Sequence, residues 1–66
     1  MDLGNLNLFM KMVVDEYKLT RSEQETLLNR MLADDKEFEK TWNIFKNKRT
    51  RAGVDSFRAL LNELIN

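Results

Sequence analysis

The hydrophobic residues of this chain recur with helical spacing in four segments, and no segment shows the alternation of apolar and polar residues typical of a strand. A helix brings residues three, four and seven positions apart onto one face. The chain has no proline and only two glycines, so few residues interrupt this spacing. The pattern predicts an all-α protein: a compact bundle of three to four short helices in a single helical domain over residues 1–66.

The first predicted helix begins near Asp2 or Asn5, either of which can cap it, and extends to Lys18. One face carries most of its apolar side chains: Leu3, Leu6, Phe9, Met10, Val13, Val14 and Tyr17. Leu8, Met12 and Leu19 lie away from that face, on a second flank. A helix that is apolar on two flanks is either central in its own bundle or shared with a partner. Leu8 and Met12 are therefore candidate residues of a partner interface.

The second predicted helix opens with Thr20 and Glu23, which have the spacing of a capping box. Its apolar side chains form one stripe: Leu27, Leu28, Met31 and Leu32. Asp34 can cap a third helix, yet the heptad spacing of residues 24–45 also allows one long helix over residues 20–48. We favour a break at residues 33–35, because Asp35 would otherwise lie unpaired in the apolar face, where a carboxylate is costly.

The third predicted helix carries three aromatic residues on one face, because Phe38, Trp42 and Phe45 are spaced by four and three positions. Large aromatic side chains bury much area, so we expect the other helices to pack around them. Trp42 can also lie at the edge of the core and be shared with a partner, which makes it a third candidate interface residue. The alternative is a base-stacking platform beside the basic residues that follow.

The last predicted helix carries a single apolar stripe: Val54, Phe57, Leu60, Leu61, Leu64 and Ile65. We expect Gly53 to end the preceding helix in the left-handed conformation, with Val54 supplying the apolar contact that often follows. Asp55 would then cap the last helix.

Composition excludes several classes of site. The chain has no cysteine or histidine, which argues against disulfides, a structural zinc site and a base for Ser22 or Ser56. The acidic run does not have the spacing of a calcium loop: Asp34, Asp35, Glu37 and Glu39. We therefore predict a protein that is not an enzyme and has no cofactor or metal. Without a membrane span or a signal-peptide pattern, a cytoplasmic location is expected.

The charge is distributed unevenly although the formal net charge is zero. Residues 1–45 carry six basic and nine acidic side chains, net −3, and residues 46–66 carry five basic and two acidic, net +3. The candidate basic patch comprises Lys46, Lys48, Arg49 and Arg51, with Arg58 from the next helix. These cations either contact phosphates or serve the carbonyl end of a helix.

Two functional hypotheses follow. We favour a small regulatory or inhibitory protein that acts by protein–protein interaction through helical surfaces, as a homodimer, and its composition is compatible with a phage or bacterial regulator. The alternative is a nucleic-acid-binding transcriptional regulator that uses the basic patch at residues 46–51. A helix-turn-helix is disfavoured, because the third segment begins with acidic residues that would repel phosphates.

Overall fold

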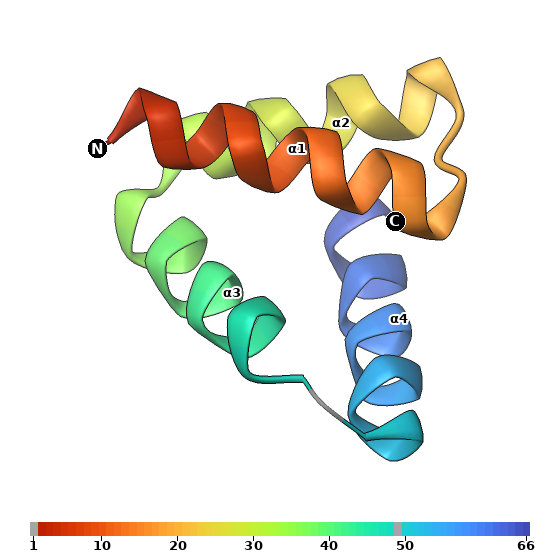
Figure 1. Cartoon of the computed structure of the whole chain (residues 1–66). Coiled ribbons are helices and arrows are strands. Elements are labelled where there is room, and N and C mark those ends of the chain that lie inside the picture. Colours follow the sequence, from red (N-terminus) through yellow and green to blue (C-terminus); the bar gives the residue numbers. More distant parts are fainter. Residues whose placement is uncertain (1, 49) are drawn as a thin grey trace.

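The computed structural model describes residues 2–48 and 50–66. In this part of the chain it contains four helices and no strand, which confirms the predicted all-α helical bundle. The helices are α1 (Leu3–Tyr17), α2 (Arg21–Ala33), α3 (Asp35–Asn47) and α4 (Arg51–Ile65) (Figure 1). None of them is long and apolar enough to span a membrane.

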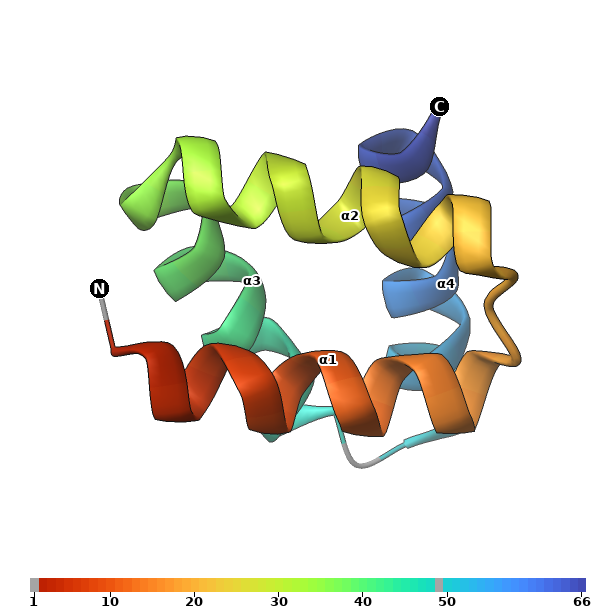
Figure 2. The same ribbon diagram turned by 90° about the horizontal axis from the view of Figure 1, so that it is seen from above.

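The helices form two layers. α1 and α2 lie side by side and run in opposite directions, joined by a short turn (Figure 2). α3 descends from the end of α2, and α4 rises again beneath the other end of the α1–α2 pair (Figures 1 and 2). The Cα radius of gyration is 10.9 Å, close to the value of about 11 Å that scaling predicts for a compact domain of this length.

Three of the predicted N-terminal caps are present, at Asp2, Thr20 and Asp34. The Asp2 carboxylate accepts hydrogen bonds from the amides of Gly4 and Asn5 at the start of α1. Thr20 and Glu23 form the reciprocal capping box at the start of α2, with bonds of 3.2 and 2.8 Å. At its other end α1 stops at Lys18, whose left-handed backbone (φ 55°) turns the chain toward α2.

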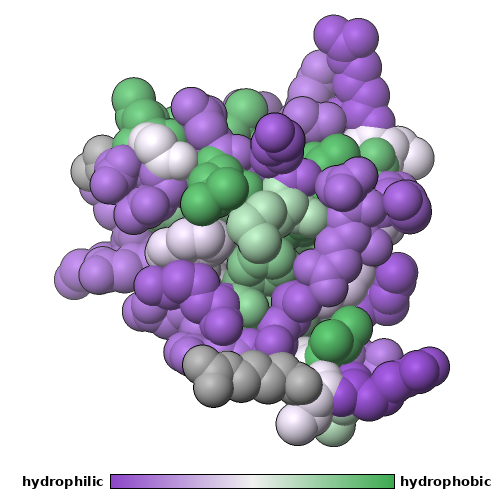
Figure 3. Space-filling model, viewed as in Figure 1, coloured by the Kyte–Doolittle hydropathy of each residue, from purple (hydrophilic) through white to green (hydrophobic). Residues whose placement is uncertain are grey.

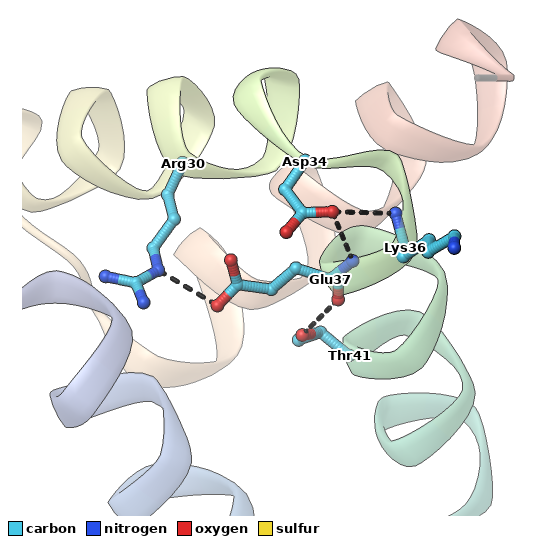
Figure 4. Close-up of polar contacts among 5 residues, drawn as sticks. All are labelled: Arg30, Asp34, Lys36, Glu37 and Thr41. Carbon is cyan, nitrogen blue, oxygen red and sulfur yellow. Dashed lines mark hydrogen bonds and ion pairs between the residues drawn. The ribbon is translucent and has the colours of Figure 1, made fainter.

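The chain breaks between α2 and α3 at Asp34, so the favoured prediction of two helices is confirmed. Asp34 has an extended backbone, and its carboxylate accepts from the amides of Lys36 and Glu37 (Figure 4). Across the same corner, the Arg30 guanidinium donates to the Glu37 carboxylate at 3.0 Å. The break leaves Asp35 exposed at the start of α3, which avoids the burial penalty of a continuous helix.

The predicted start of the last helix is wrong. α4 begins at Arg51, and its cap is Thr50, whose hydroxyl accepts from the Gly53 amide at 3.0 Å. Gly53 is therefore inside the first turn without a positive φ, and Asp55 lies beyond the cap. Starting at Thr50 gives the helix one more turn, including the bond from the Val54 amide to the Thr50 carbonyl at 3.0 Å. Threonine is an adequate cap, so the glycine is not needed as a helix stop.

All six aromatic residues of the chain meet in one cluster at the centre of the core. Phe9 of α1 is fully buried and makes edge-to-face contacts with Phe38, Trp42 and Phe45, at centroid distances of 5.6, 5.9 and 5.7 Å. Phe57 of α4 extends the cluster from Phe45 to Tyr17. Phe38 and Phe45 are buried, whereas Trp42 is half-buried. The aromatic residues of α3 thus pack around a phenylalanine that belongs to α1.

The remaining core follows the predicted apolar faces, with two differences. α2 buries Leu27 and Met31, but Leu32 is exposed because it lies about 100° round the helix from Met31. Leu3, predicted on the inner face of α1, is exposed at the first residue of that helix. Phe57, Leu61 and Leu64 of α4 are buried as predicted.

Candidate interaction surfaces

Leu8 and Met12 lie one turn apart on the outward side of α1. Their exposed fractions are 48% and 43%, which is high for side chains of this size. Both line an open groove of about 1040 Å³ that also reaches Leu19 in the turn and Leu28 of α2. Figure 3 shows hydrophobic side chains in the middle of the face that α1 crosses, surrounded by hydrophilic ones. The structure therefore brings these two predicted interface residues together.

The rim of this groove carries charge of both signs. Lys11, Asp15 and Lys18 of α1 line it, together with the amide side chains of Asn7 and Gln24. An apolar strip with a polar, mixed-charge rim is the anatomy of a protein-binding surface.

Trp42, the third predicted interface residue, lies on a different groove. This second groove, of about 440 Å³, runs between the start of α1 and one side of α3. Its lining residues are Asp2, Asn5, Asp35, Phe38, Glu39, Trp42, Asn43 and Lys46. The three candidate interface residues therefore lie on two separate grooves.

Lys48 is held inside the fold. Its side chain is only 11% exposed, and its ammonium lies 2.7 Å from the Glu16 carboxylate of α1. The same ammonium lies over the rings of Phe45 and Tyr17, at 4.7 and 5.8 Å from their centroids. Lys48 therefore fastens the end of α3 to α1, a role that its place in a basic run did not indicate.

Lys46 and Arg58, two other cations of the predicted patch, contact different aromatic rings. The Lys46 ammonium lies over the Trp42 ring at 5.3 Å, whereas the Arg58 guanidinium lies over Tyr17 at 5.2 Å. Arg51 is exposed at the start of α4. Arg49 lies outside the described residues.

Tyr17 sits where α1, α3 and α4 meet. Its hydroxyl donates to the Val54 carbonyl at 3.4 Å. Burial raises the pKa of the Tyr17 phenol above its ordinary value, although the nearby Lys48 and Arg58 cations act in the opposite direction. The neutral phenol is thus the form that the fold favours.

Two acidic residues at the start of α3 have structural roles. Asp34 caps the helix, and Glu37 pairs with Arg30. Among the residues that the structure describes, no group of three acidic, histidine or cysteine side chains is placed to hold a metal ion.

Comparisons with known proteins add no template: no family model, curated protein or solved structure matches the chain. Its function must be inferred from its own surfaces.

Proposed function

We propose that this protein is a small non-enzymatic regulator or inhibitor that works in the cytoplasm by binding protein partners through its helical surfaces. The observation that carries the proposal is the exposed pair Leu8 and Met12 on α1. The lack of cysteine suits a reducing compartment.

The fold does not require this exposed pair. Twelve hydrophobic side chains from all four helices already form the buried core. In the described residues, no buried polar side-chain atom lacks a hydrogen-bond partner. Leu8 and Met12 are adjacent on the helix surface, so they act as one strip rather than as scattered apolar residues. Methionine adapts its shape to a partner more readily than a branched side chain does.

A second copy of the chain is the first partner we propose. If two α1 helices pack antiparallel, with Leu8 of one copy against Met12 of the other, a two-fold axis repeats the same contact. Asn5 then comes opposite Asp15, where the amide can donate to the carboxylate. One helix face is smaller than the roughly 800 Å² per partner of a standard interface, so the dimer is expected to be weak.

Sedimentation equilibrium at micromolar to millimolar concentration tests this proposal. The wild-type mass should rise above that of the 7.9 kDa monomer, and Leu8→Glu or Met12→Glu should restore the monomer, because each places a charge in the apolar strip. Leu32→Glu is the matched control, since Leu32 is also exposed but lies on α2, away from the groove. A wild-type protein that stays monomeric throughout would exclude the homodimer.

A nucleic-acid-binding regulator is the alternative, supported by the exposed Arg51 in the first turn of α4. Lys48 weakens it, because a cation held by Glu16 is not available to a phosphate. Capture of partners from cell extract, with and without nuclease, separates the two hypotheses. Binding that disappears after nuclease treatment and falls steeply with salt would favour the alternative.

A further inference from the structure

The groove beside Trp42 combines an aromatic wall with carboxylates. Trp42 and Phe38 of α3 line it. Among the described residues of its lining, Asp2, Asp35 and Glu39 are acidic and Lys46 is the one cation. Asp35 already has an interaction partner of its own, so the argument rests on Asp2 and Glu39. Asp2 is fixed at the start of α1 by the two amides that it caps.

The indole of Trp42 is packed against three neighbouring aromatic rings. It stacks nearly parallel to Phe38 and Phe45, with interplanar angles of 14° and 18°, and it meets Phe9 at 90°. These rings fix the indole and leave part of it exposed at the groove. A partner that binds here therefore meets a preformed surface, which lowers the entropic cost of binding.

The chain already places a cation on this indole. The Lys46 ammonium lies 5.3 Å from the Trp42 ring centroid, within the range of a cation–π contact. The position of the Lys46 ammonium is a second indication, besides the carboxylates, that the groove favours a cationic ligand. Lys46 is exposed and carries a long flexible side chain, so another cation can displace it.

We propose that the groove beside Trp42 binds an arginine side chain from a basic segment of a partner protein. The guanidinium replaces Lys46 over the indole and faces the carboxylates of Asp2 and Glu39. Arginine fits better than lysine, because its planar group stacks on an aromatic ring while its edge donates to carboxylates. The same carboxylates would repel a nucleic-acid phosphate. The inference goes beyond the proposed dimer, since it names the chemistry of a partner at a second surface.

Nuclear magnetic resonance offers a direct test, because the chain has a single tryptophan and its indole N–H gives one resolved signal. The probe is a blocked Gly-Arg-Gly-Arg-Gly peptide, and the matched control replaces both arginines with citrulline, which has a similar shape but no charge. The indole signal should shift and saturate with the arginine peptide and stay in place with the citrulline peptide. Equal shifts with both peptides, or none with either, would overturn the proposal.

Two substitutions assign the binding to these residues. Glu39→Gln should weaken binding of the arginine peptide several-fold. Lys46→Ala should strengthen it about two-fold or more, because the internal competitor is removed. Lys40→Ala is the control for net charge, since Lys40 is exposed on α3 but does not line the groove. If Lys40→Ala strengthens binding as much as Lys46→Ala, the effect is general electrostatics and the proposed displacement is wrong.

Peptide binding can be measured apart from the dimer, although Asn5 belongs both to this groove and to the proposed dimer contact. The Leu8→Glu variant, which should not dimerise, should bind the arginine peptide as the wild type does. Loss of peptide binding in a folded Leu8→Glu variant would show that the groove depends on the dimer and would contradict a separate site.

Discussion

Phe9 is the residue on which the packing of α1 against α3 depends most. It is fully buried and contacts three aromatic rings of α3 at once. Truncation of a buried phenylalanine to alanine typically costs about 3–5 kcal/mol. Each aromatic pair contributes about 0.5–1.5 kcal/mol beyond its buried area. Because Phe9→Ala removes three pairs, we expect a loss in the free energy of unfolding near the upper end, about 4–5 kcal/mol.

That loss is large relative to the stability of so small a domain. At about 0.05–0.15 kcal/mol per residue, a chain of this length has a free energy of unfolding of about 3–10 kcal/mol. Phe9→Ala should therefore leave much of the protein unfolded at room temperature. Phe9→Leu keeps most of the side-chain volume and should remain folded. Trp42→Ala should cost less than Phe9→Ala, because Trp42 is half-buried.

Urea unfolding followed by far-ultraviolet circular dichroism measures all three variants. The expected order of destabilisation is Phe9→Ala, then Trp42→Ala, then Phe9→Leu. A Phe9→Ala protein that loses less than about 2 kcal/mol, or less than Trp42→Ala, would refute a core centred on Phe9. The core would then depend on the aromatic residues of α3 alone.

Three further predictions concern the ends of the helices. A double-mutant cycle of Lys48→Met and Glu16→Gln should give a coupling free energy of about 1 kcal/mol that decreases with salt; zero coupling would make their contact incidental. In urea unfolding, Thr50→Ala should lower the free energy of unfolding by about 1 kcal/mol and Asp55→Ala by much less. The reverse order would indicate that Asp55, the cap predicted from the sequence, is the true cap of the helix. The single tyrosine, Tyr17, should ionise above the pKa of a model tyrosine in an absorbance titration. Because the raised pKa favours the neutral phenol in the folded state, the stability that it contributes should be intact below about pH 10 and fall as the pH rises further; a Tyr17→Phe protein should lack that part of the decline.

Much of the fold can be predicted from short segments of the sequence, because helix caps and breaks depend on neighbouring residues. Thr20 and Glu23 are three residues apart and form the capping box without help from the rest of the chain. Asp34 could be identified as a helix break because a continuous helix would have placed Asp35 in the apolar face. These features depend on neighbouring residues, so a pattern in one segment is enough to predict them.

The start of α4 could not be decided in this way, because two caps compete within six residues. Gly53 and Asp55 satisfy the common rule for a helix stop followed by a new start. Thr50 offers an alternative that keeps Val54 on the apolar face and adds a turn to the helix. Packing against the other helices decides between them, and packing cannot be read from a short segment.

The division of the candidate interface has a similar cause. Leu8 lies outside the core face of its helix, whereas Trp42 lies at the edge of the core face of its own, and each pattern alone suggests a surface shared with a partner. Whether Leu8 and Trp42 lie on the same surface depends on how α1 and α3 cross. Phe9 receives Trp42 on the flank of α1 that faces α3, and Leu8 lies about 100° away from Phe9 round the same helix.

Residues 34–39 are mostly acidic and residues 46–51 mostly basic. In the folded chain these charges do not form one acidic and one basic surface. At the acidic end of α3, Glu39 lines the groove at Trp42, as does Asp2 of α1. At the basic end, Lys48 turns inward to Glu16, which removes it from the surface that a phosphate would meet. Lys46, near the basic end of α3, lies over the indole of Trp42. The fold thus withdraws Lys48 from the outer surface and places carboxylates in the same groove as an aromatic ring. A partner with a basic segment fits that arrangement better than a nucleic acid does.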